Sequence, residues 1–469
     1  MAVSPARAAA FEILLRVERE DSYAAELLHS APLSRFSSRD HGLATELVMG
    51  VLRWQSLLDE RLAGASSQKI GRLDDEVLAA LRLGVYQLQF LTRVPVRAAI
   101  FESVELVKAA RKRSAASFVN AVLRTIAGTA PEDTVAKIGK SPDSITLARN
   151  AAHPPWLVAR WTERYGLELT RQICARDQIV PDTSIHIYTR THANTNEDRC
   201  DSELADAGVQ FSPGRLLSAA RRIISGDITG TRAYREGRIS IQDEASQLVA
   251  LLAGSAVRPA TFDSAMLDSA GLDSPILDCC AAPGSKTSLL AQRNPRAKIL
   301  ATELHPHRAR LLQSLTRLPN VYVVAADARN LPFSCTFTRI LADVPCSGTG
   351  TLARNPEIKW RLKAEDLLDL QSRQVAILKS ALTRLAIGGR LVYSTCSLER
   401  EENEAVVEAA LDDTAKFAVA DIRADLEQLR RSGEMCWQDV ESLCGGPYLR
   451  TIPGVHPFDG FFAAMIERT

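Results

Sequence analysis

The sequence of 469 residues predicts an all-helical domain over residues 1–130, a small α/β unit over 145–240, and a doubly wound α/β domain over 241–469. Apolar side chains in the first part recur about every 3.6 residues, and no alternating strand pattern accompanies them. Short strand-like runs near residues 184–188 and 222–225 mark the second part. The third part repeats strand, loop and helix, which is typical of a mostly parallel sheet covered by helices on both faces.

The predicted helical domain ends in a basic segment. Its helical spacing is clearest in two groups of apolar residues, namely Ala8, Phe11, Leu14, Leu15 and Val17, then Val77, Leu78, Leu81, Val85 and Leu88. Residues 92–124 contain seven basic and two acidic side chains, a local charge of +5 in a chain whose net charge is +1. Such a segment is either a solvated helical face or a surface that contacts the phosphates of a nucleic acid.

The composition excludes several classes of protein. With 46% hydrophobic and 24% charged residues, the chain has an ordinary globular composition. It contains no apolar run long enough to span a membrane and no secretion signal, so we expect a cytoplasmic protein. Its nine cysteines form no CxxC pair and no zinc-type spacing with histidine, which predicts reduced thiols and no metal site. Residues 254–274 are expected to be a loop insertion without chemistry.

The third domain places a small-residue loop at the end of its first expected strand. Its apolar runs are Ile276–Cys280, Ile299–Thr302, Val321–Ala325, Ile340–Val344 and Leu391–Tyr393. The first run continues into the loop Cys280, Ala281, Ala282, Pro283, Gly284, Ser285 and Lys286. Small residues let a ligand approach the backbone, and the next helix offers free N–H groups. The loop has no adjacent Gly-Lys and no opening glycine, which excludes a Walker A motif.

Acidic residues end the second and third runs. Glu303 follows the loop by about 20 residues, the position at which a carboxylate accepts hydrogen bonds from a ribose diol. Asp327 follows the third run and could accept a hydrogen bond from an adenine amino group. Because parallel sheets bind ligands at the carboxyl ends of their strands, these elements together predict a site for a nucleoside-containing cofactor.

Two cysteines follow the fourth and fifth runs. Cys346 lies within residues 343–350 (DVPCSGTG), and Cys396 lies within residues 393–397 (YSTCS). Both are flanked by small residues at predicted strand ends, whereas a structural cysteine prefers apolar neighbours within a strand. Two thiols directed at one cleft indicate covalent chemistry.

These motifs resemble the RNA cytosine-5 methyltransferase family, which uses S-adenosylmethionine. The similar segments are 278–286, 343–350, 394–397, 238–247 and 453–463. The helical domain resembles the NusB-like RNA-binding domain at residues 39–54 and 117–124. The resemblance implies a Rossmann-like class I methyltransferase domain with a mixed, mostly parallel sheet, and a small α/β unit that binds RNA. The family usually has glycine at the position of Ser285, whose N–H can still donate to the cofactor if its φ is an allowed one.

The resemblance also implies a role for each site residue. Cys396 is the nucleophile that adds to carbon 6 of cytosine, and Cys346 assists release of the methylated product. Asp343 hydrogen-bonds nitrogen 3 of the base, while Lys286 holds the base or stabilises developing charge. S-adenosylmethionine is bound by Cys280, Ala281, Ala282, Pro283, Gly284, Ser285, Lys286, Glu303, Asp327 and Asp343. Cys396 needs a positive or hydrogen-bonding environment, because a free thiol has a pKa of about 8.5.

The resemblance of both domains together implies a cytosine of 16S ribosomal RNA as the target, before or during assembly of the small subunit. The same chemistry on transfer RNA or at another ribosomal site is the first alternative. The helical domain alone would suit a non-catalytic RNA-binding or antitermination-like factor, and the third domain alone a methyltransferase of proteins or small molecules. The pair of strand-end thiols weighs against both of these.

Several further residues are predicted to have structural or surface roles. Arg354 and Lys359, in the loop after Gly350, either contact RNA or belong to a solvated loop. The remaining candidates are expected to pack or to lie at the surface, namely Trp156, Trp161 and Phe461 as packing residues and His305 and His307 as capping or surface residues.

Overall fold

The computed structural model describes residues 3–20, 22–29, 35–130, 133–188, 195–255, 274–412 and 415–469. Residues 256–273, and with them nearly all of the predicted insertion, lie outside these ranges. The chain forms two compact units, the first made of residues 1–181 and 351–364, the second of residues 182–350 and 365–469. Among the described residues, no helix is both long enough and apolar enough to cross a membrane.

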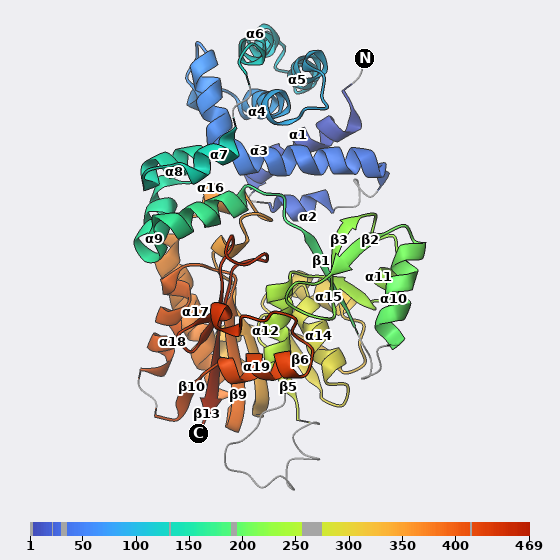
Figure 1. Ribbon diagram of the computed structural model, residues 1–469, viewed down its shortest axis with the longest axis vertical. Coiled ribbons are helices and arrows are strands. Elements are labelled where there is room, and N and C mark those ends of the chain that lie inside the picture. The colour runs from blue at the N-terminus through green and yellow to red at the C-terminus, as the bar shows by residue number, and fades with distance from the viewer. Residues whose placement is uncertain are drawn as a thin grey trace. The chain divides into compact units, whose positions relative to one another are not determined.

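The first unit is helical throughout its described residues, as predicted for residues 1–130 (Figure 1). Its helices are α1 (Pro5–Glu20), α2 (Ala24–Leu28), α3 (Ser38–Ala65), α4 (Asp75–Phe90), α5 (Val96–Ala109), α6 (Ala116–Ala127), α7 (Thr134–Gly139), α8 (Ser144–Asn150), α9 (Pro155–Asp177) and α16 (Ile358–Arg361). Gly50 of α3 allows α4 to approach closely, because a Cβ there would overlap the ring of Tyr86. α1, α3 and α4 pack against one another, and the apolar residues along each helix are buried.

The basic segment 92–124 covers α5, the turn Arg113–Ala115 and most of α6. Two of its lysines are paired, Lys108 with Glu105 at 2.8 Å and Lys112 with Asp74 at 2.9 Å. Its arginines are exposed and form no ion pair with the described residues, namely Arg93, Arg97, Arg111, Arg113 and Arg124. These arginines are thus available to an anionic partner.

The second unit begins with a four-stranded antiparallel sheet in the order β2-β3-β1-β4. Its strands are β1 (Thr183–Ile187), β2 (Gln210–Pro213), β3 (Ala220–Ser225) and β4 (Ile239–Ile241), with helices α10 (Thr195–Asp206) and α11 (Arg232–Arg235). β1 and β3 correspond to the runs predicted near residues 184–188 and 222–225. Ile185, Ile187 and Leu204 are buried in the core of this sheet.

Nine strands among the described residues form the large sheet of the second unit. They are β5 (Ile276–Asp278), β6 (Ile299–Glu303), β7 (Val321–Ala325), β8 (Phe337–Asp343), β9 (Leu385–Thr395), β10 (Phe417–Ala420), β11 (Cys444–Gly445), β12 (Tyr448–Thr451) and β13 (Phe461–Arg468). Their order is β11-β12-β13-β9-β8-β5-β6-β7, and β10 also pairs with β13. β5 to β9 are mutually parallel and β10 to β13 antiparallel, which confirms the predicted mixed, mostly parallel sheet.

Helices cover both faces of this sheet (Figure 1). They are α12 (Glu244–Gly254), α14 (Ser285–Arg293), α15 (Pro306–Leu315), α17 (Asp366–Thr383), α18 (Glu404–Leu411) and α19 (Arg423–Arg431). Leu341 and Val392 face the core formed with α12, α14 and α19, whereas Ile340 and Leu391 face the core formed with α17 and α18. Burial on both faces explains why β8 and β9 contain uninterrupted apolar runs.

Candidate active site

The predicted motifs meet at one edge of the large sheet because the parallel strands run in register. Asp278 of β5 lies opposite Leu341 of β8, and Asp343 of β8 lies opposite Ser394 of β9. The loops that follow these strands therefore leave the sheet side by side. This is the edge at which open α/β sheets bind ligands.

The two cysteine loops bring their thiols together. The Sγ atoms of Cys346 and Cys396 are 3.4 Å apart, and both side chains are half-buried. The hydrogen bond with Cys396, together with burial, raises the pKa of Cys346 well above its usual value. At this distance one thiolate disfavours ionisation of the other thiol.

Two glycines fix the backbone around the thiols. The N–H of Gly350 donates to the carbonyl of Cys396 at 2.9 Å, and the N–H of Gly460 donates to the carbonyl of Gly350 at 2.8 Å. A Cβ on Gly350 would overlap the carbonyl of Gly460, so only glycine allows this approach. The motif that contains Gly460, noted in the sequence, thus supports the cysteine loops from a third strand.

Lys286 and Asp343 form an ion pair beside the thiols. Their Nζ and Oδ2 atoms are 2.8 Å apart, and Ser394 Oγ donates to Asp343 Oδ1 at 2.7 Å. Burial favours the neutral form of Lys286, but the Asp343 carboxylate outweighs it and the pKa of Lys286 is raised. The Nζ atom also lies 5.3 Å from the centre of the Phe461 ring, so Phe461, predicted as a packing residue, also contacts this charged group.

The small-residue loop after β5 leads directly into α14. Gly284 has a φ of 116° and precedes the first helical residue, Ser285. The left-handed position is thus occupied by glycine, while Ser285 has a helical backbone that any residue can adopt. Serine in place of the family's glycine is therefore compatible with the loop, and the first N–H groups of α14 remain available to a ligand.

Asp278, at the end of β5, was not among the predicted site residues. Its Oδ2 accepts a hydrogen bond from Thr287 Oγ1 at 2.7 Å, whereas its buried Oδ1 has no partner among the described residues. Burial raises the pKa of Asp278 to about 7. An acidic residue at the carboxyl end of the first strand is the signal that could have identified it.

The two other predicted acidic residues differ in their surroundings. Glu303 is buried, and its contacts with the described residues all use Oε1, which accepts from the N–H of His305 at 3.1 Å and lies 4.0 Å from Arg308. Asp327 is partly exposed and already paired with Arg329 at 2.7 Å. Glu303 therefore has an oxygen open to a ligand, whereas Asp327 would share its carboxylate.

Lys359 was predicted to contact RNA or to be solvated, and the structure shows that both expectations are wrong. It belongs to the first unit, is 1% exposed, and its Nζ donates to the carbonyl of Arg53 at 2.8 Å. Trp161, as predicted, is a packing residue and is also 1% exposed. The charged residues next to Lys359 in the sequence gave no indication that its side chain is buried among helices.

Glu402 is a second residue that sequence reasoning missed. It is fully buried, and it accepts hydrogen bonds from Ser347 and Ser397, the residues that follow the two cysteines. It lies in an acidic run just after Cys396, a pattern that is typical of a solvated surface. Its distance of six residues from Cys396 is the only sequence signal that could have singled it out.

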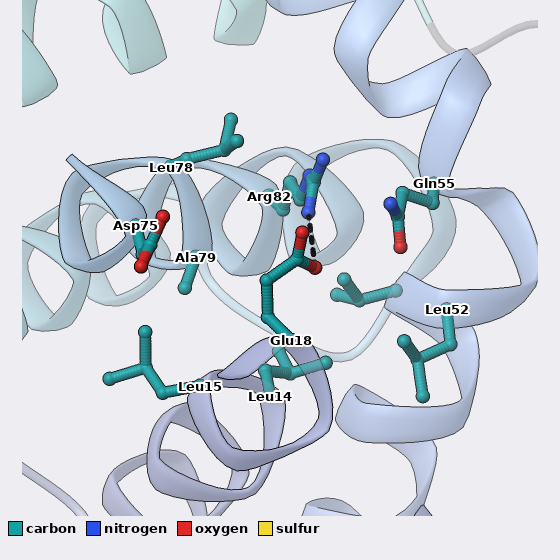
Figure 2. Close-up of a pocket in the computed structure, with 10 residues that line it drawn as sticks. Leu14, Leu15, Glu18, Leu52, Gln55, Asp75, Leu78, Ala79 and Arg82 are labelled. Carbon is teal, nitrogen blue, oxygen red and sulfur yellow. Dashed lines mark ion pairs between the residues drawn. The ribbon is translucent and has the colours of Figure 1, made fainter. Parts of the chain in front are cut away.

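Two pockets of the first unit are unrelated to the thiols. The smaller measures about 30 Å³ and is lined by residues of α1, α3 and α4; Figure 2 shows Glu18 directed at Arg82 inside it. Their charged groups are 3.8 Å apart. The larger measures about 410 Å³ and is lined by polar residues that include Arg61, Lys137 and Arg149. Only the larger could hold more than a few water molecules.

The protein joins a helical domain to a doubly wound sheet that has acidic residues and two thiols at its ligand-binding edge, and the comparisons show that it is an RNA methyltransferase. Residues 4–128 match the model of the NusB family, and residues 265–467 match the model described as 16S rRNA methyltransferase RsmB/F. The chain belongs to this family of ribosomal RNA small-subunit methyltransferases, as its relatives show.

Curated relatives match most or nearly all of the chain. The probable ribosomal RNA small subunit methyltransferase B of Bacillus subtilis (strain 168) is 32% identical, with 98% of each chain covered. The ribosomal RNA small subunit methyltransferase B of Pseudomonas putida is 34% identical over 82% of this chain and 84% of its own.

Solved structures show the same fold at lower identity. The crystal structure of PH0851 has a TM-score of 0.78 at 21% identity and covers 99% of each chain. The structure of NSun6 from Pyrococcus horikoshii with SFG has a TM-score of 0.53 at 17% identity, over 66% of this chain and 97% of its own. These likenesses support the fold, including the arrangement of the large sheet.

Proposed function

We propose that the protein transfers the methyl group of S-adenosylmethionine to carbon 5 of a cytosine in 16S ribosomal RNA, through a covalent bond between Cys396 and the base. The observation that carries this proposal is the 3.4 Å separation of Cys346 and Cys396 at the ligand-binding edge of the sheet. Methyl transfer to an already nucleophilic atom would need no thiol. A pair of thiols suits carbon 5 of cytosine, which must first be activated.

The residues of the cofactor loop fit S-adenosylmethionine, which supplies the methyl group when bound. Glu303 presents Oε2 for a ribose hydroxyl, since its contacts with the described residues all use Oε1. Asp278 presents a buried Oδ1 that has no partner among the described residues. The first turn of α14, after Gly284, offers backbone N–H groups. NSun6, a structural neighbour, was solved with SFG.

The thiols divide the chemistry between them. The thiolate of Cys396 forms a bond to carbon 6, and the electron pair of the C5–C6 double bond moves toward carbon 5. Carbon 5 then bonds the methyl group, the S–CH3 bond of the methyl donor breaks, and its electron pair leaves with S-adenosylhomocysteine. Loss of the carbon-5 proton to a base then restores the double bond and breaks the C6–S bond, returning the thiolate. Cys346, whose pKa is raised, remains a protonated thiol beside Cys396 and assists this release.

Lys286 and Asp343 orient and polarise the base. Asp343 is held by Ser394 and Lys286, so a carboxyl oxygen is fixed at the edge where nitrogen 3 of cytosine would lie. A hydrogen bond there favours the more electrophilic ring. Lys286 keeps its charge because of Asp343, and this charge stabilises negative charge that develops on the base or on Cys396.

RNA recognition is assigned to the helical unit and the small sheet. The exposed arginines of the basic segment provide the electrostatic contact with phosphates. A target in a loop of RNA suits this site, because the base must be unstacked to reach the two thiols.

The test is to treat unmethylated small-subunit ribosomal RNA with the purified protein and S-adenosylmethionine, then to map 5-methylcytosine by bisulfite sequencing. One protected cytosine in 16S RNA is expected, and none with Cys396→Ala. Methylation confined to transfer RNA would show that transfer RNA is the substrate. Methylation at another atom would overturn the proposed chemistry.

A further inference from the structure

We propose that Glu402 is a positioning residue that holds the loops of Cys346 and Cys396 in the one arrangement in which both thiols face the same base. The catalytic consequence rests on the proposed function, whereas the positioning itself rests on geometry. Glu402 ends the turn Arg400–Glu402 after β9, and none of its surface is exposed. A carboxylate so completely buried requires donors around it.

The first cysteine loop supplies two of these donors. Ser347 follows Cys346 directly, and its N–H donates to Glu402 Oε1 at 2.8 Å. The hydroxyl of the same serine donates to Oε2 at 2.5 Å. Backbone and side chain of Ser347 are therefore both fixed by one carboxylate, which sets the direction in which the preceding Cys346 leaves the loop.

The second cysteine loop shares an oxygen of that carboxylate. Ser397 follows Cys396 directly, and its hydroxyl donates to Glu402 Oε2 at 2.5 Å. The hydroxyl oxygens of Ser347 and Ser397 are consequently only 3.0 Å apart. Glu402 thus links the residues after the two thiols, and this link lies next to the 3.4 Å contact between the thiols themselves.

Glu402 is anchored to the packed core from the other side. Gln374 of α17 donates from Nε2 to Glu402 Oε1 at 2.9 Å, and also to the carbonyl of Pro345 at 2.9 Å. The hydroxyl of Tyr393, a fully buried residue of β9, donates to the backbone carbonyl of Glu402 at 2.6 Å. The link between the cysteine loops is therefore attached to a helix and a strand that are themselves fixed by packing.

Only a carboxylate satisfies this arrangement fully. Four donors converge on two oxygens, and an ionised carboxylate offers acceptors on both, whereas an amide offers one oxygen and one donor. Aspartate would be shorter by one methylene and could not reach both loops. Misplacing a reacting group by about 1 Å can slow a reaction on the order of 100-fold, so loss of the link should be visible in turnover.

The test compares the full-length protein with Glu402→Ala, Glu402→Gln and the matched control Glu404→Gln. Glu404 lies two residues further on, and its carboxylate pairs with Arg450 of β12. Binding of S-adenosylhomocysteine, measured by calorimetry, is expected to stay within about threefold of the parent in each variant, because the cofactor loop is untouched. This measurement identifies any variant that fails to fold.

The first readout is catalytic. Glu402→Ala is expected to lower kcat for methyl transfer on the order of 100-fold with little change in the KM for RNA, since the thiols are misplaced while RNA contacts remain. Glu402→Gln, which retains one acceptor oxygen, is expected to be intermediate. Glu404→Gln is expected to match the parent.

The second readout needs no RNA. Diamide, a diazene oxidant, accepts two electrons and two protons from a pair of thiols, so that an S–S bond forms and the diamide becomes a hydrazine. In the parent and in Glu404→Gln, peptide mapping by mass spectrometry should show rapid formation of the Cys346–Cys396 disulfide. In Glu402→Ala the same bond should form at least about tenfold more slowly, because the two loops are no longer linked.

The outcomes separate this inference from the proposed function. A Glu402→Ala protein that binds the cofactor product normally but forms the disulfide at the parental rate overturns the inference. If that variant does not fold, Glu402→Gln decides: slower disulfide formation supports the inference and an unchanged rate overturns it. The parent protein could also methylate no RNA and yet form the disulfide faster than Glu402→Ala. That result would support the positioning role of Glu402 and refute the proposed function.

Discussion

Two lysines of this protein are shielded from solvent, but their pKa values are shifted in opposite directions. Lys286, at the carboxyl edge of the large sheet, lies 2.8 Å from Asp343, and its pKa is raised. Lys359, in the helical unit, donates to the carbonyl of Arg53, and burial lowers its pKa to about 7 although Asp177 opposes the shift. The side chain of Lys286 is 15% exposed and Lys359 is 1% exposed, but only Lys286 has a carboxylate within contact distance.

The comparison shows what distinguishes a site from a core. In a protein interior, an opposite charge in contact with an ionisable group stabilises its charged form. Where only neutral dipoles contact the group, burial favours its neutral form. Asp177 follows the same rule, because burial raises its pKa to about 8 and its Oδ1 has no partner among the described residues. The contact with Asp343 therefore raises the pKa of Lys286, whereas burial shifts Asp177 and Lys359 toward their neutral forms, with pKa values of about 8 and about 7.

The largest expected effect separates the two lysines by activity. Lys286→Met should reduce methyl transfer by about 10²–10³-fold, since it removes a preorganised positive charge from the site. Lys359→Met should leave methyl transfer within about threefold of the parent. Initial rates with labelled S-adenosylmethionine measure both, and equal losses for the two variants would show that Lys286 has no special role.

The acidic residues offer the same comparison for cofactor binding. Glu303→Ala should weaken binding of S-adenosylmethionine by about 1–3 kcal/mol, the range for loss of a charged hydrogen-bond partner. Asp327→Ala is the matched control and should cost less, because Arg329 already occupies that carboxylate. Calorimetry showing unchanged affinity in folded Glu303→Ala would remove Glu303 from the cofactor site.

The buried carboxyl group of Asp177 in the helical unit should make the free energy of unfolding depend on pH. The folded-state pKa of Asp177, about 8, exceeds the ordinary value of 3.8, so between these values the folded protein binds more protons than the unfolded chain. Its contribution to stability is therefore fully present below about pH 4 and is lost as pH rises toward 8. Asp177→Asn should remove this loss.

Urea unfolding of the parent and of Asp177→Asn at pH 5 and pH 8 tests the sign. The parent should lose stability relative to the variant as pH rises. Lys359 contributes in the opposite sense above pH 7, because its folded pKa lies below the ordinary value of 10.5 and stability gained from it increases with pH. A difference between the two proteins that is independent of pH would mean that Asp177 is ionised in the folded state.

The smallest effect concerns exposed charges. Replacing Arg111 and Arg113 by glutamine should weaken RNA binding at low salt and reduce the slope of log K against log salt by about 1–2, provided that each contacts a phosphate. Lys108→Gln is the control, since Lys108 is already paired with Glu105. An unchanged salt slope in filter binding would mean that the basic segment is a solvated face.

The helices and strands that were predicted from the sequence are those that a local pattern of apolar residues determines. β5, β6, β8 and β9 were visible because strands buried on both faces have continuous apolar runs, and the helices of the first unit were visible from their period. The edge strand β7 also has an apolar run, although none of its residues is fully buried. β2 and β4 were missed because they contain four and three residues and are partly exposed. Short strands of this kind are defined by their neighbours rather than by their own composition.

The site was predictable to the same extent. Cys346 and Cys396 follow strands, so their meeting at one edge could be inferred from the parallel topology. The roles of Glu402 and Lys359 could not, because both are charged residues in polar stretches that tertiary contacts remove from solvent. The local sequence around a charged residue does not show whether residues distant in the chain will bury it or donate hydrogen bonds to it.

The measurement that tests the central claim most directly is the incubation of Cys396→Ala and Cys346→Ala with 16S RNA and S-adenosylmethionine, followed by denaturing electrophoresis. Cys346→Ala should attack the base, transfer the methyl group and stall, so that a protein–RNA adduct persists. Cys396→Ala should form no adduct and no 5-methylcytosine. An adduct with Cys396→Ala and none with Cys346→Ala would reverse the two roles, and no adduct with either variant would contradict release by Cys346.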